Sequence, residues 1–278
     1  MTTSKISLIT ATYNRRDFFP NIIRCVLAQT YPLDKMEWII IDDGEDKIED
    51  LIKPYLDNPK KNKGLTFRYY YYPEKLKLGR KRNLLNEKST GDIIVCLDDD
   101  DFYPPTRVSH AVTKLNQQKK AIIAGASKLF CYYNHIKKVY EYGPYGPYHG
   151  TNATFAYRRE YLKKHSYEDH AEQAEESFFT NKFTEPLIQL DPYKTMLCIV
   201  HNHNTFDKID IIGKKQFKSK ECRHRLKDFV KDKKLRDFYI NIKINPDKNK
   251  RGNRKKKEDT DNVPDSSDSI FDNASKKT

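Results

Sequence analysis

Short apolar runs alternate with longer segments of helical periodicity through the first 125 residues. The runs have the length and β-branched composition of buried strands, whereas the segments between them repeat apolar residues every three to four positions. This pattern predicts strands at 6–10, 38–41, 65–72, 93–97 and 121–124, and helices at 18–27, 78–86 and 105–118. Strands that are separated by helices indicate an α/β protein with a mostly parallel sheet, flanked by helices in the Rossmann-like manner.

The pattern changes after residue 126. Short aromatic strands, a Gly-Pro loop at 143–147 and an acidic helix around 172–179 predict an α+β second half. We therefore expect one domain over residues 1–213, with a first half at 1–125 and a second half at 126–213.

The remaining residues form two further segments. A helical extension is expected at 214–245, where a basic amphipathic helix over 214–239 would have Cys222, Leu226, Phe229 and Val230 on one side. Packing of that side onto the domain is the favoured interpretation, and peripheral contact with a membrane surface is the alternative. Residues 246–278 contain few apolar residues and are expected to be a disordered basic tail, since they have little to bury.

Charge is concentrated at the C-terminal end of the 278 residues. Residues 214–278 hold 21 Lys/Arg and 11 Asp/Glu, whereas residues 1–213 hold 31 and 28, so most of the formal net charge of +13 lies in the extension and tail. The tail lacks aromatic residues interleaved with its basic residues and lacks a folded nucleic-acid-binding module, which argues against nucleic acid as a partner. A nucleic-acid-binding protein that acts through this tail remains an alternative function class.

Cysteine usage and hydropathy indicate a soluble cytoplasmic protein. The five cysteines are scattered without a CxxC pair, which favours a reducing compartment over a disulfide framework. The apolar run at 6–9 is too short for a signal peptide, and nothing later reaches the length of a membrane span. The Lys-, Asn-, Ile- and Tyr-rich composition is typical of AT-rich genomes, which include those of low-GC microbes and of large DNA viruses that replicate in a host cell.

Polar loops follow three of the predicted strands, at 10–15, 42–44 and 98–101. Ligands of open α/β sheets bind at the carboxyl ends of the strands, but neither a P-loop nor a GxGxxG string occurs. Asp42-Asp43-Gly44 alone is typical of a turn. Four consecutive aspartates at 98–101 repel one another unless a cation offsets their charge, so they favour a Mg²⁺ or Mn²⁺ site over a solvated acidic loop.

Four motifs in order resemble the GT-A-fold glycosyltransferases of family 2. They are ISLITATYNRR, IIIDDGE, LGRKRNLL and VCLDDDDFYPP, and the resemblance covers roughly residues 4–205. It implies a nucleotide-diphosphosugar donor, inversion of the anomeric centre, and Mg²⁺ or Mn²⁺ held by a DxD motif. The acceptor would be a hydroxyl group of a glycan, a lipid-linked sugar or a protein. Another metal-dependent nucleotide-sugar enzyme, such as a nucleotidyltransferase, is the alternative.

The resemblance also implies roles for single residues. Asp43 would accept the N3–H of uracil, which favours a UDP-sugar because a carboxylate only accepts hydrogen bonds. Arg80 and Arg82 would lie near the donor phosphates, and Asp101 would cap or orient its neighbours. The residues implied for binding the nucleotide-sugar are Thr10, Ala11, Thr12, Tyr13, Arg15, Asp43, Arg80, Asp98 and Asp99. Asp100 is the implied metal ligand, and His201 or His203 would complete the metal shell.

The general base is implied near the acidic helix. Glu176 occupies the position where the family usually has an aspartate, with Glu175 as the nearest rival and Asp169 and Glu172 as others. Inversion by single displacement needs one carboxylate that takes the proton of the acceptor hydroxyl. A solvated acidic helix face is the alternative for any one of these acids.

Overall fold

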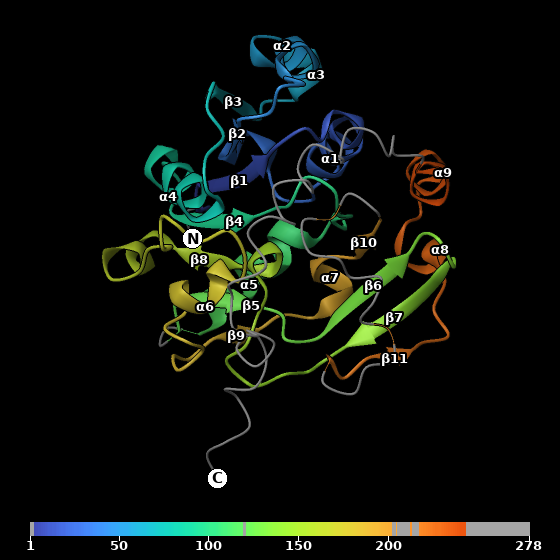
Figure 1. Cartoon of the computed structure of the whole chain (residues 1–278). Helices are drawn as coiled ribbons and strands as arrows, with labels where there is room; N and C mark the ends of the chain where they lie inside the picture. The colour runs from blue at the N-terminus through green and yellow to red at the C-terminus, as the bar shows by residue number, and fades with distance from the viewer. Residues whose placement is uncertain (1–2, 119–120, 202–203, 205–211, 213–216, 243–278) are drawn as a thin grey trace, which may run out of the picture.

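The computed structural model describes residues 3–118, 121–201, 204, 212 and 217–242 (Figure 1). Within this part of the chain, a seven-stranded mixed sheet has the order β3-β2-β1-β4-β8-β5-β9. Its strands are β1 (Ile6–Thr12), β2 (Met36–Asp42), β3 (Thr66–Tyr71), β4 (Ile93–Cys96), β5 (Ile123–Gly125), β8 (Ala156–Arg158) and β9 (Ile188–Gln189). Strand β8 is antiparallel to β4 and β5, whereas the other pairs are parallel.

A second, four-stranded sheet has the order β10-β6-β7-β11. Its strands are β6 (Leu129–Tyr133), β7 (Lys138–Tyr142), β10 (Cys198–Val200) and β11 (Lys220–Glu221). The helices are α1 (Phe19–Leu27), α2 (Glu49–Leu56), α3 (Pro59–Asn62), α4 (Leu78–Lys88), α5 (Arg107–Gln117), α6 (Glu175–Phe179), α7 (Pro192–Thr195), α8 (Leu226–Phe229) and α9 (Lys233–Asn241). The α/β fold class with a mostly parallel sheet and an α+β second half is thus confirmed.

Strand β2, between β3 and β1, is buried on both faces, as expected for a parallel strand that helices cover. Its alternate residues serve two cores. Trp38 stacks on Phe19 of α1 with ring centroids 6.2 Å apart, whereas Ile39 on the opposite face packs in a cluster with Leu85 of α4. Because β2 and β4 both pair in parallel with β1, the carboxyl ends of these three strands meet at one edge of the sheet, between α1 and α4 (Figure 1).

The predicted strands and helices of the first half are present, with boundaries shifted by a few residues. The sequence pattern missed α2 and α3, which fill the connection between β2 and β3. Pro54 lies inside α2, and Asn58 caps α3 by accepting from Lys60 N at 3.1 Å. Proline and asparagine are typical of turns as well as of helix starts, so the sequence pattern does not predict these two helices.

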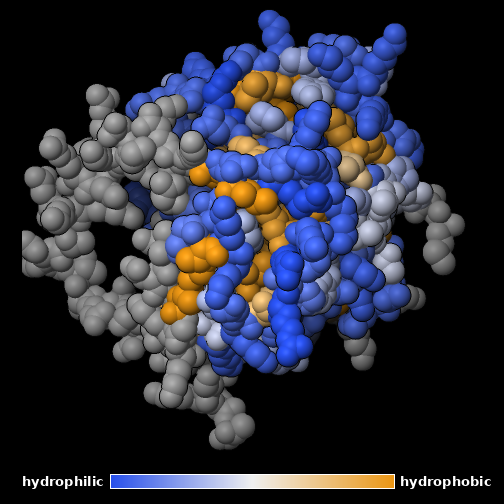
Figure 2. All heavy atoms as spheres, turned by 90° about the vertical axis from the view of Figure 1, so that its right-hand side faces the viewer, coloured by the Kyte–Doolittle hydropathy of each residue, from blue (hydrophilic) through white to orange (hydrophobic). Residues whose placement is uncertain are grey.

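The prediction of one helix over 214–239 is wrong in the part that the structure describes. Cys222 lies outside any helix, and α8 and α9 are separate because Asp232 caps α9 by accepting from Leu235 N at 3.0 Å. Leu226 and Val230 belong to the buried core, so this side packs onto the domain as favoured. Figure 2 shows separate apolar patches between hydrophilic side chains on this face of the molecule.

The remaining predictions about the C-terminal segments concern residues 243–278, which lie outside the described residues. None of the helices in the described ranges is long and apolar enough to cross a membrane. The division of residues 1–213 into two halves stays a prediction.

Candidate active site

The start of helix α4 is fixed by the loop 168–171. A Cβ atom at Gly79 would lie 1.8 Å from the carbonyl oxygen of Glu168, so only glycine lets the loop approach this closely. Gly79 N donates to Ala171 O at 2.9 Å, which satisfies one of the N–H groups that lack a partner at a helix start. Because α6 begins four residues beyond this loop, the same contact holds α6 beside α4.

Lys81 joins the loops that follow β1 and β2. Its buried ammonium donates to Thr12 O at 3.1 Å and pairs with the carboxylate of Asp43. The other oxygen of Asp43 accepts from Leu76 N at 2.7 Å. Burial lowers the pKa of Lys81, and the charge of Asp43 opposes that effect. The predicted uracil acceptor is therefore a fully buried carboxylate that already accepts two hydrogen bonds.

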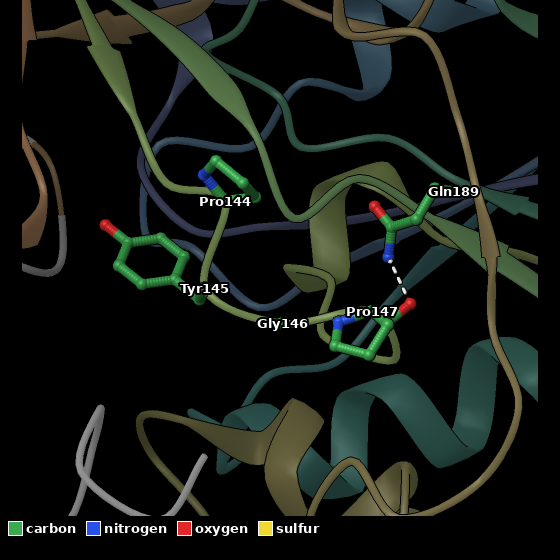
Figure 3. Close-up of a pocket in the computed structure, with 5 residues that line it drawn as sticks. All are labelled: Pro144, Tyr145, Gly146, Pro147 and Gln189. Carbon is green, nitrogen blue, oxygen red and sulfur yellow. Dashed lines mark hydrogen bonds between the residues drawn. The ribbon is translucent and has the colours of Figure 1, made fainter. Parts of the chain in front are cut away.

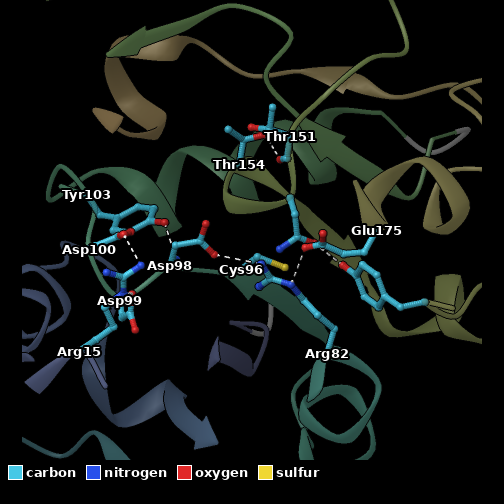
Figure 4. Close-up of polar contacts among 12 residues, drawn as sticks. Arg15, Arg82, Cys96, Asp98, Asp99, Asp100, Tyr103, Thr151, Thr154 and Glu175 are labelled. Atoms are coloured by element: carbon cyan, nitrogen blue, oxygen red, sulfur yellow. Dashed lines mark hydrogen bonds and ion pairs between the residues drawn. The ribbon is translucent and has the colours of Figure 1, made fainter. Parts of the chain in front are cut away.

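Arg82 joins the aspartate loop to helix α6 (Figure 4). Its Nη2 is 3.2 Å from Asp98 Oδ1, and its Nε is 3.1 Å from Glu175 Oε1. In the orientation that satisfies its neighbours, the amide oxygen of Asn152 accepts from Nη1 at 2.7 Å. A buried guanidinium with two carboxylates and an amide thus meets the condition that buried charges be paired and hydrogen-bonded.

Arg15 offsets the charge of the next two aspartates. Its Nε lies 3.8 Å from Asp99 Oδ1, and its Nη2 lies 3.6 Å from Asp100 Oδ2. Burial, together with the neighbouring Asp100, raises the pKa of Asp99 to about 7. The cation that the aspartate run requires is thus supplied in part by an arginine from the loop after β1.

The predicted metal ligands Asp100 and His201 lie side by side. His201 Nε2 is 3.2 Å from Asp100 Oδ2, whereas His203 lies outside the described residues. Adjacent ligands on an octahedral ion are about 3 Å apart when each bond is about 2.0–2.1 Å, so this pair fits two positions around one Mg²⁺ or Mn²⁺. Asp101 points elsewhere, since its Oδ1 accepts from Ile199 N at 2.8 Å and secures β10.

Within the described ranges, His, Cys, Asp and Glu side chains form no ready-made group of three that could hold a metal ion. A cation held by Asp100 and His201 would need further oxygen ligands from another source. Donor phosphates and water are the ligands that Mg²⁺ usually adds to one or two protein carboxylates.

The two predicted acids of α6 have different surroundings. Glu175 is buried and engaged by Arg82, whereas Glu176 is half-buried. Burial, then the charge of Glu175, raises the pKa of Glu176 to about 8, and the charge of Arg82 opposes the shift. A carboxyl group with a raised pKa is the better proton acceptor near neutral pH.

The residues predicted to line the base are only partly accessible. Thr10 is buried and accepts from Trp38 Nε1 at 2.9 Å, whereas Ala11 and Tyr13 are half-buried. The ammonium of Lys75 lies 4.4 Å from the ring centroid of Tyr13. The exposed part of this loop is therefore an aromatic face with a cation against it.

Three other predicted residues lie on the outer surface. Arg80 pairs with Glu87 at 3.1 Å on the exposed side of α4, and Glu172 pairs with Lys77. Asp169 accepts from the side chain of Asn83 at 2.7 Å. None of these contacts involves the aspartate run, so Arg82 is the arginine of this helix that reaches it.

Sequence reasoning did not select Lys81. A signal was available, because helical spacing places position 81 on the same face as Leu84 and Leu85, which are buried. A lysine on a buried helix face requires a carboxylate partner. Its partner Asp43 is 38 positions away, and no local pattern connects the two.

The predicted Gly-Pro loop borders a cavity of about 330 Å³ (Figure 3), lined by Pro144, Tyr145, Gly146, Pro147 and Gln189. The amide nitrogen of Gln189 donates to Pro147 O at 2.9 Å and to His149 O at 2.8 Å. Its amide oxygen accepts from Ser127 N at 2.9 Å. Gln189 therefore fastens the loop to β9, and the charged residues of the site do not line this cavity.

Comparison with known proteins places this arrangement in context. A family model described as Glycosyl transferase family 2 matches residues 7–184. Among solved structures, a mannosyltransferase from Pyrobaculum calidifontis, in complex with GDP-Man and Mn²⁺, is similar with a TM-score of 0.56 and 16% identity. The similarity covers 73% of this chain and 59% of that one. S. aureus TarS 1-349, in complex with UDP-GlcNAc, has a TM-score of 0.53 at 16% identity, with 72% and 60% covered.

Two curated relatives match over shorter stretches. An uncharacterized protein of Haemophilus influenzae is 32% identical over 96 residues, which are 34% of this chain and 49% of the relative. An uncharacterized glycosyltransferase of Rickettsia typhi is 29% identical over 113 residues, which are 40% of this chain and 32% of the relative. The match thus spans less than half of either relative.

Proposed function

Because the chain belongs to glycosyl transferase family 2, we propose that it transfers a sugar from a UDP-sugar to a hydroxyl group of an acceptor. One observation carries the proposal. Residues from four separate segments meet at the carboxyl edge of the sheet, where Arg15, Asp98–Asp100, Arg82 and Glu175 surround one charged site (Figure 4). Open α/β sheets bind their ligands at this edge.

A nucleotide-sugar donor is supported by the structural neighbours, which are described with GDP-Man or UDP-GlcNAc. Asp43 favours uridine over adenosine and cytidine, because its carboxylate suits the imide N–H of uracil, and the predicted loop 10–13 would exclude guanosine by shape. Asp43 is buried beneath Lys81 and Leu76, so direct contact with the base requires these groups to move. The single imide donor does not distinguish uracil from guanine, which makes the shape of the loop decisive.

The divalent ion is proposed to lie between Asp100, His201 and the donor diphosphate. The 3.2 Å separation of Asp100 Oδ2 and His201 Nε2 supports this position. Bound there, Mg²⁺ or Mn²⁺ would offset the charge that develops on the departing diphosphate. Asp98 and Asp99 would then orient the ribose and the water around the ion, and Arg15 would add a positive charge beside Asp99 and Asp100.

Glu176 is proposed as the general base. The acceptor oxygen would attack C1 of the sugar while its proton passes to the Glu176 carboxylate. The bond from C1 to the diphosphate oxygen breaks, its electron pair stays on the diphosphate, and the configuration at C1 is inverted. Glu175 is the weaker candidate because Arg82 pairs with it, whereas the pKa of Glu176 is raised by burial and by Glu175.

Two measurements test the proposal. Calorimetry with Mn²⁺ present should show UDP binding more tightly than GDP, ADP or CDP, and equal affinity for GDP would refute the uridine assignment. Transfer assays with a panel of UDP-sugars should release UDP, whereas release of pyrophosphate would indicate a nucleotidyltransferase.

Variants of the acids test the base. Glu176→Gln should bind UDP normally and lower transfer roughly 10²–10⁴-fold, the usual contribution of a positioned base. Glu87→Gln is the matched control, since Glu87 pairs with Arg80 on the exposed side of α4. Normal transfer by Glu176→Gln would move the base to Glu175 or to another carboxylate.

A further inference from the structure

Arg82 is a buried cation that contacts both the aspartate loop and helix α6. It is 4% exposed, and each of its three nitrogens has a partner from a different segment of the chain. Asp98 lies 16 residues from Arg82 and belongs to the loop with the predicted donor ligands. Glu175 lies 93 residues away and precedes the proposed base directly.

We infer that Arg82 is a positioning residue for the proposed transfer, which holds the donor-side carboxylate Asp98 and the acceptor-side helix α6 at a fixed spacing and sets the charge beside the proposed base on that helix. The inference rests on the proposed function. Arg82 does not need to touch the substrate in this role. Its planar fork binds Asp98 and Glu175 through different nitrogens at 3.2 and 3.1 Å, a geometry that the single ammonium of lysine does not reproduce.

The geometry explains why the two adjacent glutamates differ. Arg82 pairs directly with Glu175, whereas Glu176 has no such partner from Arg82, and burial and the charge of Glu175 raise its pKa. The charged groups that act on Glu176 are Glu175 of the same helix, Arg82 of α4 and Asp98 of the aspartate loop. Two of these are negative and one is positive, so removal of the positive one shifts the balance strongly.

Two variants are expected to shift the pKa of Glu176 in opposite directions. Without the guanidinium, Arg82→Met leaves Glu175 and Asp98 uncompensated, and the pKa of Glu176 should rise. In Glu175→Gln the negative neighbour is lost while Arg82 remains, and the pKa of Glu176 should fall. A nearby charge shifts a pKa by about 1–3 units, so the acidic limb of the transfer rate should move by about one pH unit or more in opposite directions.

The experiment measures kcat/KM for UDP-sugar turnover from pH 5 to pH 9 in the full-length chain. The variants are Arg82→Met, Arg82→Lys and Glu175→Gln, with Lys88→Met as the matched control because Lys88 lies at the opposite end of the same helix, against the ring of Tyr70. Circular dichroism and UDP calorimetry accompany each profile. We expect the limb to shift upward in Arg82→Met, downward in Glu175→Gln and not at all in Lys88→Met. Arg82→Lys should keep the limb near its wild-type pH but lower kcat, since the charge remains and the fork is lost.

Each outcome decides the inference. An acidic limb that is unchanged in folded Arg82→Met, or that moves in the same direction in Glu175→Gln, overturns it. If Arg82→Met does not fold, the inference is tested by the expected downward shift in Glu175→Gln and the expected loss of kcat in Arg82→Lys. Wild-type profiles in both of these variants would overturn the inference. A wild-type chain that neither binds UDP nor turns over any UDP-sugar contradicts the proposed function instead, which separates the two failures.

Discussion

Replacement of Lys81 by methionine should destabilise the protein strongly, because it leaves a buried carboxylate without its counter-charge. The Lys81 and Asp43 side chains are 6% and 0% exposed, so water cannot replace the lost ammonium. Breaking a buried ion pair by removing one partner costs about 3–5 kcal/mol. At roughly 2–4 °C per kcal/mol for a domain of this size, the melting temperature of Lys81→Met should fall by about 6–20 °C.

Thermal denaturation followed by circular dichroism at pH 7 measures this effect. Lys77→Met is the matched control, because Lys77 pairs with Glu172 where the two side chains are 55% and 62% exposed. An exposed pair of this kind contributes about 0–1 kcal/mol, so the control should melt within a few degrees of the wild type. The double variant Lys81→Met/Asp43→Asn should recover part of the loss, since the unpaired charge is gone.

The reasoning is refuted if Lys81→Met melts within about 2 °C of Lys77→Met. It is also refuted if the double variant is as unstable as Lys81→Met alone, because the loss would then come from packing and not from the uncompensated carboxylate. In the first case Asp43 would be accessible to water, and its availability to a nucleoside would have to be reassessed.

Three further predictions concern other parts of the site. Asp100→Asn should keep the melting temperature of the wild type but abolish transfer. Excess EDTA should also abolish transfer by the wild type. Full activity in either assay would exclude Asp100 as a metal ligand. Gly79→Ala should lower the free energy of unfolding by about 1–3 kcal/mol through overpacking, since the new Cβ would lie 1.8 Å from Glu168 O. Urea denaturation measures this loss, and Lys88→Ala at the other end of α4 is the control. Burial and Glu175 raise the pKa of Glu176 in the folded state, so its contribution to stability is complete below about pH 4.5 and is lost as the pH rises to about 8. Urea denaturation at pH 5 and pH 8 should therefore show a smaller difference in Glu176→Gln than in the wild type, and equal differences would contradict the shift.

The sequence was sufficient for those parts of the site that local patterns encode. Strand ends can be read from apolar runs, so the positions of Asp43 and of the aspartates after β4 followed directly from the pattern. The adjacency of Asp100 and His201 at 3.2 Å depends on how β10 of the second sheet packs beside the aspartate loop, and only the family resemblance predicts it.

The partners of the buried cations could not be predicted in the same way. Lys81 reaches Asp43 and Arg82 reaches Glu175 across 38 and 93 positions of the chain. Such pairs depend on how helices pack on the sheet, which periodicity does not specify. Position 82 was weighed only as one of two arginines, and its neighbour Arg80, chosen for the nucleotide, pairs at the surface with Glu87.

The insertion of β8 between β4 and β5 affects how the protein is made on the ribosome. Ile93, Ile94 and Val95 pair with residues 156–158, which are synthesised about 60 residues later. At about 5–20 residues per second, the edge of β4 waits roughly 3–12 s for its partner. An unpaired strand edge is a template for association with other chains. The first 125 residues are therefore an incomplete sheet, and a nascent chain of that length exposes the edge of β4 that β8 later covers.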